Sequence, residues 1–110
     1  MQATLISTKQ FDAKTGGLLS EDERGEVEFA LACAPEAHPV IPGTGGVRKM
    51  RWNRLVMGKR GGIRVIYYYI TRAGSVGLIT AYAKSAKDNI SDNEKKAIRR
   101  IARWFEETTR

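Results

Sequence analysis

The segment 63–84 constrains the fold of this 110-residue chain more than any other part of its sequence. Its first half, IRVIYYYIT at 63–71, is rich in β-branched and aromatic residues, which favour strands. The residues RAGS at 72–75 have the composition of a turn, and a second strand is predicted at 76–84. The segment therefore predicts a β-hairpin, and its short connection makes the two strands antiparallel.

Alternation along the predicted strands assigns side chains to faces, because successive residues of a strand point to opposite sides. A further strand is predicted at 47–53. On it one face carries Val47, Lys49, Arg51 and Asn53, and the other carries Arg48, Met50 and Trp52. On the second hairpin strand the same rule groups Leu78, Thr80, Tyr82 and Lys84, with Ile79, Ala81 and Ala83 opposite them.

Two helices are predicted from capping boxes. In a capping box, a serine and a glutamate three residues later each bind the backbone amide of the other. The first box is at 20–23 and predicts a helix to about Ala34; the second, at 91–94, predicts one to about Thr108. A first strand is expected at 3–8, and a short or broken helical turn at 11–19 because of Gly16-Gly17. The length is typical of one domain, so residues 1–110 are predicted as a single domain.

Charge is distributed unevenly along the chain. The formal net charge is +7, yet no Asp or Glu occurs between Glu36 and Asp88, where ten Lys or Arg are found. The residues before Pro39 carry three bases against seven acids, and those from Asp88 onward carry six against five. The excess is therefore confined to one segment that overlaps the predicted strands. A concentrated positive electrostatic field favours an anionic partner, and a polyphosphate backbone is a common one.

Several kinds of site are excluded by the residues present. One histidine, His38, and one cysteine, Cys33, cannot form a zinc site or an intrachain disulfide. The glycines at 43–46 and 58–62 match neither the phosphate loop of nucleotide-binding proteins nor the dinucleotide pattern. A two-metal nuclease needs clustered carboxylates, which the basic segment lacks. We expect no metal, no cofactor and no membrane span, and a cytoplasmic location.

If the chain cuts a phosphodiester, Lys, Arg and Tyr must carry the chemistry. RNA allows this, because its 2′-OH is an internal nucleophile and arginines can stabilise the charge that develops on the phosphoryl oxygens. A lysine can accept the 2′-OH proton only as the neutral amine, and crowding by other cations lowers its pKa in that direction.

Three motifs carry a family resemblance: GTGGVRKMRW at 43–52, GKRGGIRVIYYY at 58–69 and LITAYAKS at 78–85, followed by the capped C-terminal helix. In order and spacing they resemble HigB-type toxins of the RelE/ParE superfamily. The resemblance implies an α+β fold, with an antiparallel β-sheet packed with N-terminal helices and a C-terminal helix. It also implies a bacterial type II toxin–antitoxin module whose toxin cleaves mRNA on the ribosome without metal.

The resemblance also assigns residues to roles. The catalytic candidates are Lys49, Arg51, Arg64, Lys84 and Tyr82. Tyr82 is included because the family's tyrosine after the fourth strand has no counterpart here, and Lys84 is favoured over Tyr82 for proton transfer. The RNA-binding candidates are Arg48, Arg54, Lys59, Arg60 and Lys87. The outer basic face of the C-terminal helix, which includes Lys95, is expected to be solvated or to face rRNA.

The expected partners are a cognate antitoxin, expected to be a helix-turn-helix protein, together with the ribosome and mRNA. Operator DNA is expected only through the antitoxin. Two alternatives remain open at this point: a ParE-like poison of DNA gyrase, which shares the fold, and an RNA-binding module without catalytic activity.

Overall fold

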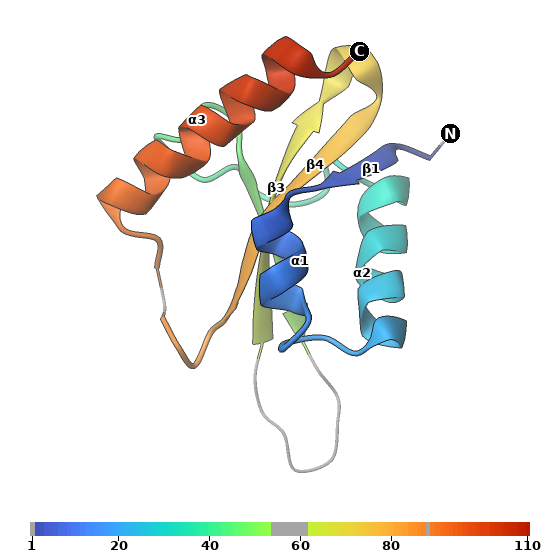
Figure 1. Ribbon diagram of the computed structural model, residues 1–110, viewed down its shortest axis with the longest axis vertical. Coiled ribbons are helices and arrows are strands. Elements are labelled where there is room, and N and C mark those ends of the chain that lie inside the picture. Colours follow the sequence, from blue (N-terminus) through green and yellow to red (C-terminus); the bar gives the residue numbers. More distant parts are fainter. Residues whose placement is uncertain (1, 54–61, 88) are drawn as a thin grey trace.

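The fold is built from a four-stranded sheet and three helices (Figure 1). The computed structural model describes residues 2–53, 62–87 and 89–110. The elements in chain order are β1 (Thr4–Ser7), α1 (Lys9–Thr15), α2 (Glu21–Cys33), β2 (Arg48–Asn53), β3 (Gly62–Ile70), the 3₁₀ turn Thr71–Ala73, β4 (Ser75–Ala83) and α3 (Asp92–Thr108).

The sheet has the strand order β1-β4-β3-β2. Strands β2, β3 and β4 are antiparallel neighbours, as predicted, whereas β1 pairs in parallel with β4. The α+β class is thus confirmed, but the sheet is mixed rather than wholly antiparallel. The parallel pair is possible because β1 and β4 are joined by most of the chain, and parallel neighbours need such a long connection.

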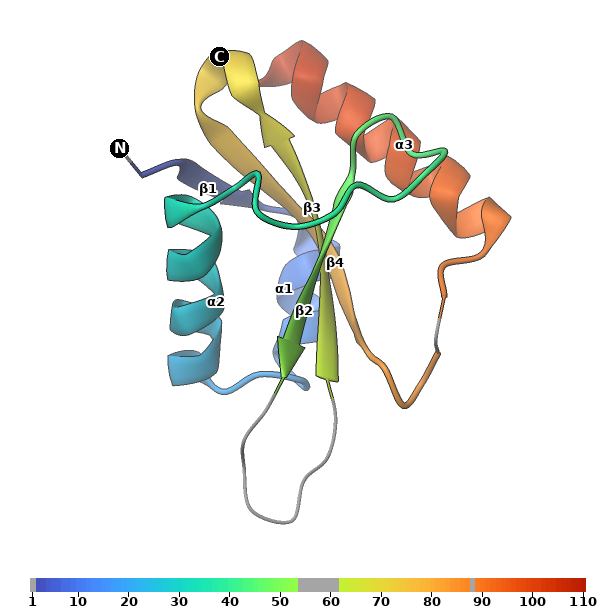
Figure 2. The same ribbon diagram turned by 180° about the vertical axis from the view of Figure 1, so that it is seen from behind.

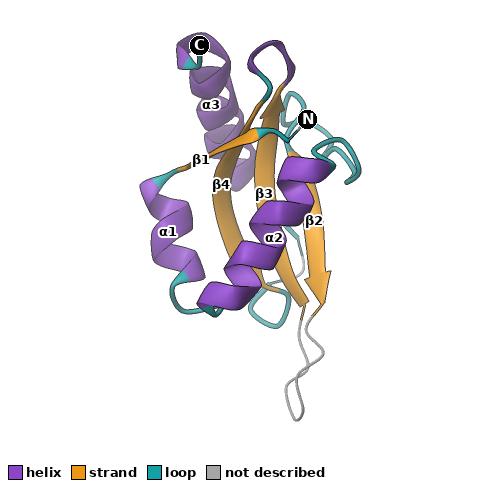
Figure 3. Cartoon of the chain, turned by 90° about the vertical axis from the view of Figure 1, so that its right-hand side faces the viewer, coloured by secondary structure: helices purple, strands orange, loops and turns teal. Residues whose placement is uncertain are grey.

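Two helices cover opposite faces of the sheet. Figure 3 shows α2 crossing one face and α3 lying on the far side, with α1 beside the β1–β4 edge. We call the two sides the α2 face and the α3 face. Fully buried residues of the α2-face core are Val27, Leu31, Val65, Tyr67, Val76 and Leu78. Buried residues of the α3-face core are Val47, Ile66, Ile70, Ile79, Ile98, Ala102 and Phe105.

Both predicted capping boxes are formed. The Ser20 hydroxyl accepts from the Glu23 amide at 3.1 Å, and the Glu23 carboxylate accepts from the Ser20 amide at 3.0 Å. Ser91 and Glu94 make the same reciprocal pair at 3.2 and 3.1 Å. The helices therefore begin where local sequence placed them. Helix α3 buries Ile98, Ala102 and Phe105, whereas Ala97 is exposed.

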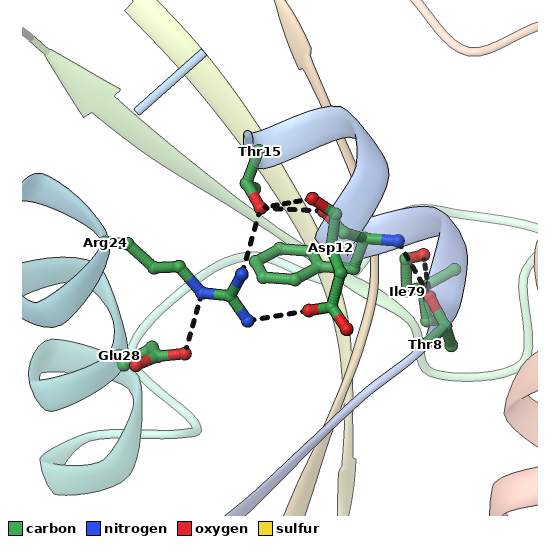
Figure 4. Close-up of polar contacts among 7 residues, drawn as sticks. Thr8, Asp12, Thr15, Arg24, Glu28 and Ile79 are labelled. Atoms are coloured by element: carbon green, nitrogen blue, oxygen red, sulfur yellow. Dashed lines mark hydrogen bonds and ion pairs between the residues drawn. The ribbon is translucent and has the colours of Figure 1, made fainter. Parts of the chain in front are cut away.

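Helix α1 is longer than the broken turn that the glycines suggested. It begins after Thr8, whose hydroxyl accepts from the Phe11 amide at 3.0 Å, and it ends at Thr15, before Gly16. Arg24 of α2 joins the two helices: it pairs with Asp12 at 2.7 Å and lies 5.2 Å from the centroid of the Phe11 ring (Figure 4). The hydroxyl of Thr8 also donates to the Ile79 carbonyl at 2.7 Å, which ties α1 to β4.

A β-bulge changes the faces predicted for β4. Ile66 pairs with Thr80, but Tyr67 pairs with Leu78, so Ile79 is an extra residue in the ladder. Leu78 therefore packs in the α2-face core and Ile79 in the α3-face core. The predicted grouping of Leu78 with Thr80 and Tyr82 is wrong, because one inserted residue reverses the alternation beyond it.

The segment between α2 and β2 is ordered and runs across to α3 before it enters the sheet (Figure 2). Its residues lie beside β2: the Lys49 amide donates to the Pro39 carbonyl at 3.1 Å, and the Ile41 amide donates to the Val47 carbonyl at 2.8 Å. The buried Thr44 hydroxyl donates to the Ile41 carbonyl at 2.6 Å, which closes a turn. The glycines at 43–46 thus belong to a tight turn. None of the described helices combines the length and hydropathy needed to cross a bilayer.

Candidate functional site

The candidate site lies where the α3 face extends past helix α3. In the sheet register Arg51 of β2 pairs with Arg64 of β3, and Arg64 pairs with Tyr82 of β4. Directly paired residues point to the same face with Cβ atoms about 5 Å apart, so the three side chains form a row across three strands. Lys49 lies two residues from Arg51 on the same face, opposite Ile66. The alternation predicted for β2 is confirmed.

Arg64 is a charged residue that the fold buries. Its side chain is only 8% exposed, and its buried Nη1 has no hydrogen-bond partner among the described residues. Gly62 makes room for it, because a Cβ atom on Gly62 would stand 2.4 Å from this Nη1. Buried donors are nearly always satisfied, so an orphaned guanidinium N–H indicates a site that an anion completes.

Tyr82 stands next to Arg64 and is also 8% exposed. Its hydroxyl is buried and has no partner within the described part of the chain. Burial raises the pKa of this hydroxyl, and the nearby Arg64 opposes the rise only in part. The phenol therefore stays protonated, which suits it to donate a hydrogen bond and not to accept the 2′-OH proton.

Lys49 is half-buried beside the two arginines. Burial lowers the pKa of its ammonium, and the positive charges of Arg51 and Arg64 lower it further. The two causes act together because the charged form loses water and gains only like-charged neighbours. The surroundings of Lys49 thus favour its neutral amine.

Lys84 comes directly after β4 and is exposed. Its amide donates to the Gly62 carbonyl at 2.9 Å, which continues the β3–β4 ladder by one residue. Its backbone therefore lies at the Arg64 end of the sheet, as predicted. The resemblance favoured Lys84 over Tyr82 for proton transfer, and this role stays a prediction.

Two of the predicted RNA-binding residues, Arg48 and Lys87, lie within the described part of the chain. Arg48 points away from the row, and its Nη1 donates to the carbonyl oxygens of His38 at 2.7 Å and Glu36 at 3.2 Å. Lys87 lies over the Tyr82 ring, 4.7 Å from its centroid, and forms an ion pair with Glu94. Arg54, Lys59 and Arg60 lie outside the described residues. The roles of all five in RNA binding stay predictions.

A groove that the sequence did not reveal adjoins the row. It has a volume of about 290 Å³. It is lined by Pro39, Val40, Ile41, Pro42, Lys49, Arg51, Asn89, Ile90 and Lys95. Lys95 was assigned to the outer face of its helix, and only the path of the chain before β2 brings it near Lys49. The apolar Val40-Ile41 pair between prolines is the one signal in the sequence that this connector is ordered.

Comparisons with known proteins give a family match. A family model described as the RelE toxin of the RelE / RelB toxin-antitoxin system matches residues 43–110, more than half of the chain. The matched region contains the five catalytic candidates. Within the described residues no group of three or more His, Cys, Asp or Glu lies close enough together to hold a metal ion.

Solved structures with a similar fold include a double mutant of the E. coli toxin RelE in the free state. It is 17% identical, has a TM-score of 0.58, and the match covers 80% of this chain and 90% of that one. The intact E. coli RelBE toxin-antitoxin complex also matches, at 17% identity and a TM-score of 0.49, over 72% of this chain and 93% of that one. At this level of identity the RelE mutant supports the fold.

Proposed function

Because the chain belongs to the RelE toxin family, we propose that it is the toxin of a type II toxin–antitoxin module and a ribosome-dependent mRNA endonuclease. The row Arg51–Arg64–Tyr82, in which the buried Nη1 of Arg64 has no partner among the described residues, is the observation that supports this function best. It offers donors to a phosphate from three neighbouring strands. The finer resemblance to HigB-type members stays a prediction.

The reaction that suits these residues is attack of the RNA 2′-oxygen on the adjacent phosphorus. The neutral amine of Lys49 takes the 2′-OH proton, since this lysine has the lowered pKa. The bond from O2′ to phosphorus forms while the bond from phosphorus to O5′ breaks. The products are a 2′,3′-cyclic phosphate and a 5′-hydroxyl end, so atoms and charge balance without water.

The other residues act on the phosphoryl group. Arg64 and Arg51 bind its non-bridging oxygens and stabilise the negative charge that grows in the transition state. The protonated hydroxyl of Tyr82 adds a hydrogen bond from the third strand. Lys84, at the exposed end of β4, supplies the proton that the departing O5′ needs. DNA lacks the 2′-OH, so the same residues leave it intact.

The partners follow from the family. We propose a cognate antitoxin that neutralises the toxin, and contact with operator DNA only through this antitoxin. The target of the toxin is mRNA on the ribosome. With these partners we propose a cytoplasmic location. A chain whose positive charge is concentrated in one segment suits binding to ribosome-held RNA, where phosphates are dense.

Mapping transcript 5′ ends on purified translating ribosomes tests this function. The wild type should cut mRNA at fixed positions within codons. Arg64→Ala should cut about 10²–10³-fold more slowly, because one donor to the developing charge is lost. Lys84→Ala should also slow the cut. The exposed Arg110, beyond the end of α3, gives the matched control, Arg110→Ala.

The three candidate functions give different results. Equal rates for Arg64→Ala and wild type, with both folded, would contradict the site. Intact transcripts together with gyrase-linked DNA breaks would identify a ParE-like poison. Binding of RNA without any cleavage or growth arrest would identify a non-catalytic module.

A further inference from the structure

The groove beside Lys49 and Arg51 is formed by two segments far apart in the sequence. One is the stretch 39–42 before β2, and the other is 89–95, which leads into α3. The two catalytic candidates form part of its lining, so the groove opens directly onto the α3-face row. Neither segment contains any of the catalytic candidates named above.

The walls of the groove are held in place by contacts already formed. The Pro39 carbonyl accepts a backbone hydrogen bond from Lys49 of β2 at 3.1 Å, and the Ile41 amide donates one at 2.8 Å to Val47, directly before β2. Ile41 is 9% exposed, and Ile90 packs partly buried against the same core. Ser91 caps α3 directly after Ile90. A site with fixed walls loses little conformational freedom when a ligand binds.

The lining combines cationic groups with an aliphatic surface. Lys49, Arg51 and Lys95 supply positive charge, and no Asp or Glu from the described ranges is part of the lining. Between them lies an apolar wall that includes Val40, which is 46% exposed. Asn89 adds an amide that both donates and accepts hydrogen bonds.

This combination matches one nucleotide of single-stranded RNA. The phosphate groups meet the cations, an unstacked base lies against the aliphatic wall, and the Asn89 amide meets the polar edge of the base. A volume of about 290 Å³ is at the lower end of small-molecule sites. It therefore suits one base and not a longer segment.

We propose that this groove binds one unpaired mRNA base next to the scissile phosphate and sets the nucleotide preference of the toxin. The inference rests on the proposed function, because it assigns a subsite to the same cleavage reaction. The shared residues Lys49 and Arg51 place the base directly beside the phosphate that they bind. Among the described residues the charged groups of the lining are all cationic, and the lining is continuous with the site, which favours RNA over a protein segment as the occupant.

A library of mRNAs, randomised around the ribosomal A-site codon, tests the subsite. Wild type, Asn89→Ala and Val40→Ser are each given the library on purified ribosomes, and the sequences at the cuts are counted. Both variants should change the relative cutting of competing nucleotides at one position by about tenfold. Val40 is exposed, so Val40→Ser folds even if Asn89→Ala does not. Lys96→Ala, exposed on α3 and outside the groove, should keep the wild-type profile.

Each outcome decides the proposal. A nucleotide profile unchanged in both groove variants overturns the subsite. Loss of antitoxin binding in the groove variants, with the profile unchanged, also overturns it and identifies a protein as the occupant. Absence of any cutting by the wild type is a separate failure, because it contradicts the endonuclease function itself.

Discussion

The two faces of the four-stranded sheet differ in their use. On β3, odd-numbered residues such as Val65 and Tyr67 enter the α2-face core and are fully buried. The even-numbered residues change character along the strand: Ile66 and Ile70 are core, whereas Arg64 is a buried cation. On β3, the residues of one face pack in the α2-face core, whereas the other face is core under α3 and a site beyond it. Stability and chemistry are thus separated by strand alternation and by where α3 lies.

The α2 face should contribute stability without contributing to catalysis. Leu78→Ala leaves a cavity in a fully buried position, so the free energy of unfolding should fall by about 2–5 kcal/mol. Urea denaturation measures this change. Cleavage per folded molecule should remain at the wild-type rate, and a slower rate at full folding would show that the two faces are coupled.

The contact of α3 with the sheet depends on one glycine. A Cβ atom on Gly77 would stand 2.5 Å from Cε2 of Phe105, which is itself 1% exposed. Gly77→Ala should therefore lower the free energy of unfolding by about 1–3 kcal/mol through overpacking. Adding Phe105→Leu should recover part of this loss, which a double-mutant cycle by denaturation measures. Strictly additive effects would contradict the contact.

At the site end of the α3 face, the cleavage rate should depend on pH through the protonation of Lys49. Because burial and two arginines lower the pKa of this lysine, the neutral amine becomes available at lower pH than for an ordinary lysine. The single-turnover cleavage rate should rise about tenfold per pH unit below that pKa and level off above it. Lys49→Arg should be slow and lose this slope, and an unchanged profile would exclude Lys49 as the base.

The smallest effects distinguish two neighbouring tyrosines on opposite faces. The Tyr67 hydroxyl donates to the Pro35 carbonyl at 2.8 Å, and the Tyr68 hydroxyl donates to Glu106 at 2.7 Å. Tyr67→Phe should cost about 1 kcal/mol of unfolding free energy at all pH values below the Tyr67 pKa of about 12. Tyr68→Phe should cost less, because Glu106 is partly exposed.

The cost of Tyr68→Phe should also depend on pH. The hydrogen bond from Tyr68, and then Arg72, lowers the pKa of Glu106 below its ordinary value of 4.5. The stabilisation is therefore complete above the unfolded pKa and is lost as the pH falls through the lower folded one. Thermal denaturation from neutral to acidic pH should show the difference between Tyr68→Phe and wild type shrinking, with Tyr67→Phe as the control. A constant difference would contradict the Glu106 contact.

Local sequence determined much of this molecule. The two capping boxes fixed where α2 and α3 begin, because each box is completed within four residues. Strand alternation placed Lys49 and Arg51 together and apart from Arg48, because successive side chains of any strand point to opposite faces. The acid-free window indicated an anionic partner, and the family resemblance singled out Arg64 and Tyr82.

Tertiary structure decided the rest. The parallel pairing of β1 with β4, the bulge at Ile79 and the Gly77–Phe105 contact join segments far apart in the chain, so no local pattern records them. The same reason applies to the site. The burial that singles out Lys49, and the approach of Lys95 and the 39–42 segment to it, exist only after the sheet and α3 have packed. Sequence thus supplied the charged residues, and packing determined which of them share one environment.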